Sequence, residues 1–197
     1  MANGTLRRFS ELNGFFLTRG GPAVGILFLV GAIIGQFVLG GSYITLIAII
    51  ASLALRSIVE WCLHKYLWHL KGFKLMGVFL YNPIYRMHLL HHRNPGDISG
   101  FLFGPAAVVV FSISLFGAGS LIFDLFAGFT MVMAGLIMLL FYEWFHLLAH
   151  SDIMPKSQWL RKIVVRHRFH HSTDAHKCYC VSQIWADCLM STDLRID

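Results

Sequence analysis

Four long stretches of this sequence are apolar and almost free of charge, and they constrain the fold more than any other feature. They cover residues 23–42, 43–63, 101–121 and 125–145. Each is about twenty residues long, the length that a helix needs to cross the hydrocarbon core of a bilayer. Charged residues make up only 13% of the chain. The sequence therefore predicts an all-α integral membrane protein with four transmembrane helices, and it excludes a disordered chain, a coiled coil and an ordinary soluble enzyme.

The four spans are expected to form two hairpins that return to the same side of the membrane. Gly40, Gly41 and Ser42 leave a short link between the first two spans, and Asp124 lies in the short link between the last two. All sixteen Lys and Arg then fall on the side opposite these links, which the positive-inside rule identifies as the cytosol. A re-entrant hairpin is the alternative, and it brings the flanking segments to the same face.

A single domain in five parts is predicted. The parts are a basic N-terminal segment (1–22), a first hairpin (23–63), a cytosolic segment (64–100), a second hairpin (101–145) and a cytosolic tail (146–197). The N-terminal segment lacks an apolar core, so it is interpreted as a surface segment and not as a signal peptide. The net charge of +6 is attributed to membrane topology and not to nucleic-acid binding. We expect free thiols, a reducing compartment, and a bacterial inner membrane or the endoplasmic reticulum.

Ten of the eleven histidines form four clusters beside the spans. They are His64, His69, His88, His91, His92, His146, His150, His167, His170 and His171. Positions i, i+3 and i+4 share a helix face, so HLLHH and HRFHH would each present three imidazoles to one side. His64 and His69 are five residues apart, about 140° around an ideal helix, and either straddle a site or mark a helix end. His176 is interpreted as a solvated loop residue.

Ten imidazoles exceed what one metal ion binds, since zinc takes four ligands and other transition metals take up to six. A cytosolic helical cap with a histidine-rich dinuclear metal site is therefore predicted. For any single histidine, a hydrogen-bonded core residue is the alternative. Glu60, Glu143 and Asp174 could hydrogen-bond the second nitrogen of a ligand. The alternatives are charges at helix ends for the two glutamates and a loop or capping residue for the aspartate.

Four segments together resemble the histidine boxes of the fatty acid hydroxylase superfamily, which also contains sterol desaturases, sterol oxidases and carotenoid hydroxylases. They are EWCLHKYLWHLK, HLLHH, FYEWFHLLAH and VVRHRFHHSTDAHKCYCVSQIWADCLMST, from about residue 56 to residue 192. The first and third boxes are most similar to the fatty acid 2-hydroxylase branch. The last segment resembles the closing S-x-x-W-D pattern, with Ala186 inserted between Trp185 and Asp187.

The resemblance implies a non-haem di-iron oxygenase that hydroxylates a C–H bond of a lipid, most directly a fatty acyl chain, with O2 as co-substrate. The ten clustered histidines would bind two Fe ions or lie beside the ligands, with Zn as a substitute in purified protein. The chain has no room for a fused haem domain, so a separate electron-transfer protein and reductase are expected. An anionic head group or an acidic carrier could bind Lys65, Lys71, Lys74, Arg86, Arg93, Arg161, Lys162, Arg166 and Arg168. For any one of them, the alternative is a basic residue that only follows the positive-inside rule.

Other functions stay open at this point. A desaturase, or a sterol or carotenoid hydroxylase, would use the same site. A membrane cytochrome would use histidine pairs as axial haem ligands, but it needs them deep within the spans. A zinc hydrolase would act without O2 or a reductant.

Overall fold

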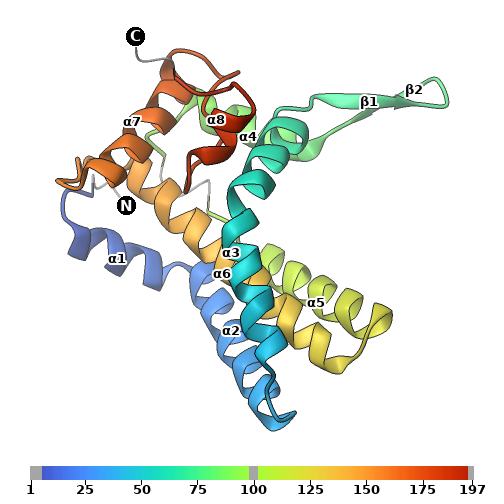
Figure 1. The fold of residues 1–197 in the computed structure, drawn as a ribbon. Coiled ribbons are helices and arrows are strands. Elements are labelled where there is room, and N and C mark those ends of the chain that lie inside the picture. The colour runs from blue at the N-terminus through green and yellow to red at the C-terminus, as the bar shows by residue number, and fades with distance from the viewer. Residues whose placement is uncertain (1–5, 98–101, 195–197) are drawn as a thin grey trace. The chain divides into compact units, whose positions relative to one another are not determined.

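The computed structural model describes residues 6–97 and 102–194 and is mostly helical (Figure 1). The chain divides into two compact units. Unit 1 comprises Met1–Phe9, Ser57–Phe101 and Phe145–Asp197, and unit 2 comprises Ser10–Arg56 and Leu102–Trp144. Parts of the predicted N-terminal segment, cytosolic segment, second hairpin and tail (1–5, 98–101 and 195–197) lie outside the described residues.

Four helices are long and apolar enough to cross a membrane, as predicted. They are α2 (Gly20–Val38), α3 (Tyr43–Leu63) with the π-helical turn η1 (His64–Trp68), α5 (Pro105–Ile122) and α6 (Leu125–His150). The third span begins later than predicted because Pro105 occupies the first helical turn. The fourth continues to His150, so the third histidine cluster is part of the membrane-spanning helix.

Small residues allow close packing in unit 2. Gly40 and Gly41 turn the chain between α2 and α3 with φ of +92° and +58°, which residues with a Cβ rarely adopt. A Cβ on Gly119 would lie 2.7 Å from Cα of Gly128, so α5 and α6 meet backbone to backbone near their link. The buried aliphatic core of this unit is formed by Ala32, Val108, Val132 and Leu136.

A buried polar cluster joins three spans within unit 2. The amide nitrogen of Gln36 in α2 donates to the Phe126 carbonyl at 2.7 Å and to Oγ1 of Thr130 at 2.8 Å, both in α6. Its amide oxygen accepts from Oγ1 of Thr45 in α3 at 3.2 Å. Gln36, Thr45 and Thr130 are buried, so these bonds satisfy polar groups that lie away from solvent, and they link the two hairpins.

We expect Gln36→Leu to lower the stability of the membrane-spanning bundle by about 1 kcal/mol, because interhelical hydrogen bonds in membranes are worth about that much. The measurement is thermal unfolding in detergent micelles. Phe37→Leu is the matched control, since Phe37 is the next residue and is exposed. Equal melting temperatures for both variants would contradict the linking function of Gln36.

The N-terminal segment contains a helix. Helix α1 (Phe9–Thr18) buries Leu12 and Phe16 on one face. The two side chains are four residues apart, so they project from the same side of the helix. The sequence predicted a surface segment here, without a helix.

Unit 1 contains three further helices and a small sheet. These are α4 (Pro83–Arg93), α7 (Gln158–Ser172), α8 (Trp185–Leu189) and the antiparallel strands β1 (Gly72–Leu75) and β2 (Val78–Tyr81). The hairpin adds two strands that the all-α prediction lacked. Asn82 begins α4, because its side chain accepts from the Ile84 amide and Pro83 follows it.

Candidate metal centre

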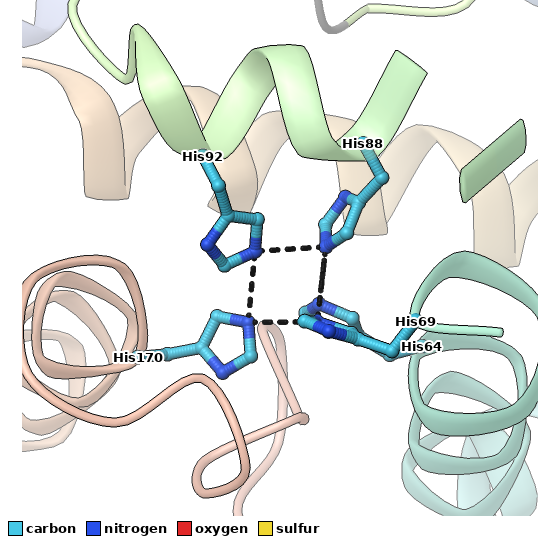
Figure 2. Close-up of side chains that lie close together, drawn as sticks. All are labelled: His64, His69, His88, His92 and His170. Carbon is cyan, nitrogen blue, oxygen red and sulfur yellow. Dashed lines mark hydrogen bonds between the residues drawn. The ribbon is translucent and has the colours of Figure 1, made fainter. Parts of the chain in front are cut away.

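The ten predicted histidines all lie in unit 1 and form two groups of five. The first group is His64, His69, His88, His92 and His170 (Figure 2), and the second is His91, His146, His150, His167 and His171. Within each group, one ring nitrogen from every residue lies within 4.8 Å of the others. His176 lies in neither group and is exposed.

Four Nε2 atoms of the first group form a closed ring, drawn with dashed lines in Figure 2. The Nε2–Nε2 distances are 2.9 Å for His92–His88, 3.2 Å for His88–His69, 3.3 Å for His69–His170 and 3.2 Å for His170–His92. His64 Nε2 lies 3.0 Å from His88 Nε2. The centre of a planar square of this size is about 2.2 Å from each corner, close to a metal–imidazole bond.

The second group also brings Nε2 atoms close together. Nε2 of His91 lies 3.1 Å from Nε2 of His146, and Nε2 of His150 lies 2.9 Å from Nε2 of His167. Both ring nitrogens of His171 are buried without a hydrogen-bond partner from the protein. Buried polar atoms are rarely left in this state, so the donor set fits a bound cation. The rings of His92, in the first group, and His171, in the second, stack with their centroids 4.1 Å apart, so the two groups adjoin.

Each H-x2-HH box divides its histidines between the groups. On α4, His88 and His92 are four residues apart and join the first group, while His91 joins the second. On α7 the pattern is reversed: two residues join the second group and His170 joins the first. The expectation that three imidazoles of one box face one site is therefore refined, because each of these helices lies between two centres.

The turn η1 explains how His64 and His69 reach one group. An ideal α-helix would separate them by about 140°. Instead, the amide of His69 donates to the carbonyl of His64 at 3.1 Å, the i+5 to i bond of a π-helical turn. This bond places the two rings in a stack with centroids 5.1 Å apart. The helix end predicted by one of the two sequence alternatives is thus a π turn.

Backbone carbonyls orient several of these rings. Nδ1 of His64 lies 2.6 Å from the Tyr179 carbonyl, and Nδ1 of His170 lies 2.6 Å from the Lys177 carbonyl. A carbonyl only accepts, so each Nδ1 carries the proton and each Nε2 directs its lone pair into the first group. In the second group, the ring of His150 hydrogen-bonds to the backbone of Pro95. Metal-binding histidines in proteins are commonly oriented in this way.

The segment 177–182, which supplies two of these carbonyls, is held by two buried carboxylates. Asp187 accepts from the amides of Tyr179 and Cys180 at 3.0 and 2.9 Å. Glu60 accepts from the amides of Val181 and Ser182 at 3.2 and 3.0 Å and from the Ser182 hydroxyl. The strap, as we call segment 177–182, is therefore held by carboxylates from Tyr179 to Ser182.

Burial keeps the imidazoles neutral. It lowers the pKa of His69, His91 and His170 to about 4 and that of His92 to about 3. Neighbouring histidines lower the pKa of His69 and His92 further, while the Asp97 carboxylate opposes the shift at His91. Burial also lowers the pKa of His88, His167 and His171. Near neutral pH these rings retain the lone pair that a metal ligand requires.

The three predicted supporting acids have different surroundings. Glu60 holds the strap, as described above, and so acts on backbone amides. Glu143 accepts from the Phe103 amide at 2.5 Å within unit 2. Asp174 accepts from the His176 amide at 2.9 Å, and its charge acts on His170. None of these hydrogen bonds joins a carboxylate to a ring nitrogen of the two groups.

Two residues of the predicted basic rim point inward instead. Arg166 is buried and pairs with Asp187 at 3.2 Å and with Asp193. Arg168 donates to the carbonyls of Ala149 and Ser151 at 3.0 and 2.5 Å. Arg166 is therefore held in the protein interior, whereas Arg168 is half-buried and is held by backbone carbonyls.

Sequence reasoning missed the strap and its anchor. Carbonyls have no residue-type signature, so nothing marked Lys177 or Tyr179. Asp187 did carry a signal, because it is an acid among apolar residues, and it is fully buried in α8. Ala186 lies in this short helix between Trp185, which is exposed, and Asp187, which is buried.

Comparisons with known proteins place this chain in a family and find a similar fold. The family model described as fatty acid hydroxylase matches residues 49–192, which include all ten histidines. A solved structure, titled full-length scs7p with only the hydroxylase domain visible, is similar with a TM-score of 0.69 and 18% identity, covering 95% of this chain and 70% of that chain. No curated protein sequence matches. The chain belongs to the fatty acid hydroxylase family.

Proposed function

We propose that this protein is a membrane-bound oxygenase that hydroxylates a C–H bond of a lipid, most directly a fatty acyl chain, using O2 and electrons from a separate carrier and reductase. The observation that carries the proposal is the pair of adjoining five-histidine groups, built partly from the ends of two membrane-spanning helices. Family membership supports lipid hydroxylation as the reaction class.

Two iron ions, one in each group, are the proposed cofactor. Imidazole is a suitable ligand for iron. Because imidazole ligands are neutral, the ions would keep their full positive charge, which would favour the binding of anionic oxygen species. The iron pair, when bound, would supply O2 activation and the removal of hydrogen from an unactivated C–H bond. Zinc, which also binds imidazole, is expected to substitute in purified protein.

The protein's own residues orient and shield this site. The strap carbonyls hold His64 and His170 with their Nε2 atoms toward the first group. His64, His146, His167 and His170 are buried, which limits the access of water. A dry site protects a reactive oxidant from side reactions.

The location of the groups favours a lipid substrate. His64 follows α3 directly, and His146 and His150 are in the last turns of α6. An acyl chain leaving the bilayer would need to rise only a short distance to reach them. By the positive-inside rule we assign this face to the cytosol of a bacterial inner membrane or the endoplasmic reticulum.

Lipid analysis of cells that express the protein tests this function. We expect lipids that gain one oxygen atom, and the atom should derive from labelled O2. Cells with His91→Ala should lack the product, and cells with His176→Ala should retain it, because His176 lies in neither group. Loss of two hydrogens would identify a desaturase. A Soret band, or turnover without O2, would overturn the proposal in favour of a haem protein or a zinc hydrolase.

A further inference from the structure

The β1–β2 hairpin exposes an unusual amount of apolar surface. Figure 1 shows it reaching away from the helices of unit 1. Its turn contains Met76 and Gly77, both with positive φ, and the Met76 side chain is 97% exposed. Its strands pair Phe73 with Leu80 and Leu75 with Val78. These ten residues contain one charge, that of Lys74, and no acid.

The two faces of the hairpin differ. Partners across an antiparallel ladder lie on the same face, and alternate residues lie on opposite faces. The outer face, as we call it, consists of Phe73, Leu75, Val78 and Leu80, all of them exposed. The opposite face carries Lys74, Phe79 and Tyr81, which are exposed as well. The ring of Phe79 contacts that of Tyr81 with centroids 6.5 Å apart, and the ring of Tyr81 contacts that of Tyr85 in α4 with centroids 6.3 Å apart. The opposite face is thus the one with ring contacts to α4 and the one with a charge, whereas the outer face is wholly apolar.

Water is an unfavourable surrounding for this element. Two-stranded hairpins are marginally stable in water unless one face packs against something. Contiguous exposed apolar surface of this kind marks a contact with a membrane or a partner. Two features of the chain favour the membrane.

The first feature is position. The apolar helix that ends in η1 stops at Trp68, and β1 begins at Gly72. A helix of 26 residues is about 39 Å long, which exceeds the hydrocarbon core of about 30 Å, so its end lies in the headgroup region. The hairpin therefore begins at the depth where aromatic and basic side chains are favoured.

The second feature is charge. Residues 61–96 contain five Lys or Arg and no Asp or Glu. The five are Lys65, Lys71, Lys74, Arg86 and Arg93. A basic segment beside a membrane span is attracted to anionic headgroups, whereas an acidic surface would be repelled.

We propose that the hairpin inserts its outer face into the boundary between headgroups and acyl chains of an anionic leaflet, with Lys74 directed to the lipid phosphates. The hairpin is tied to the first histidine group, since the Asn82 amide donates to the carbonyls of Leu67 and Leu70 at 2.6 and 2.9 Å. His69 lies between these two residues and His88 lies on α4. The hairpin therefore places a lipid contact next to the candidate metal centre, whichever metal that centre binds.

Fluorescence quenching by spin-labelled lipids tests the insertion. A fluorescent amino acid is introduced at Val78 or at Lys74 of the full chain, and each protein is placed in nanodiscs of phosphatidylcholine or of equal parts phosphatidylcholine and phosphatidylglycerol. The two positions lie on opposite faces of one hairpin, so they form a matched pair. Metal content identical to that of the parent protein verifies that both variants are folded.

We expect the label at position 78 to be quenched several times more strongly than the label at position 74, and more strongly in the anionic nanodiscs than in neutral ones. Met76→Asp in the protein labelled at position 78 should reduce the quenching. Equal and weak quenching at both positions would overturn the proposal. Crosslinking of the outer face to a second copy, without lipid quenching, would also overturn it and would identify a protein interface instead.

Discussion

Replacing His88 by alanine is expected to abolish the proposed hydroxylation and to remove one of the two proposed metal ions, that of the first group. The His88 Nε2 lies 3.0, 3.2 and 2.9 Å from the Nε2 atoms of three other histidines in this group. Losing only a partner that orients a ligand typically weakens metal binding by about 10–100-fold, so losing a ligand should cost at least about a hundredfold in activity. Metal content per chain and product formation are the two measurements.

His91→Ala is the matched variant, because His91 lies one turn further along α4 and belongs to the second group. It should retain the metal of the first group and lose that of the second. His176→Ala should keep both ions. If either His88→Ala or His91→Ala keeps both ions, or loses both while the chain stays folded, the two groups are not separate metal centres.

Asp187→Ala should strongly lower the stability of unit 1, by about 2–4 kcal/mol, because each buried donor left without an acceptor costs about 1–3 kcal/mol. The substitution removes one of the two carboxylates that pair with the buried guanidinium of Arg166, leaving only Asp193, and it removes the acceptor of two buried strap amides. Because the Tyr179 carbonyl would then be free to move, the first group should release its metal more readily than the second. Thermal unfolding and metal release by a chelator measure these effects.

The control for this variant is Asp152→Ala, which breaks an exposed pair with Arg7 at 3.9 Å. Surface pairs of this kind contribute about 0–1 kcal/mol. We therefore expect Asp152→Ala to leave the melting temperature and the metal content nearly unchanged. Equal effects of the two substitutions would show that the buried Asp187 network does not stabilise the cap.

Features that repeat along the chain could be predicted from the sequence. Hydropathy predicted four spans, since a bilayer requires about twenty apolar residues for each. The spacing of the boxes predicted that ten histidines would converge. All ten do lie in unit 1, although their binding of metal is still a prediction. Both inferences depend on local patterns, which a single sequence contains.

Features that depend on partners distant in the chain could not be predicted. The division of each H-x2-HH box requires knowing that α4 and α7 each lie between two groups. The π turn at His64–His69 departs from ideal helix geometry, and no residue type in HKYLWH predicts a π turn. The bond between the His64 ring and the Tyr179 carbonyl spans 115 positions of sequence.

An anomalous scattering map from crystals of the iron-loaded protein would test the central claim most directly. We predict two iron peaks, one enclosed by the Nε2 atoms of His69, His88, His92 and His170 with His64 beside them, and the other among the five histidines of the second group. One peak, or peaks away from both groups, would contradict the assignment of these histidines to two metal ions.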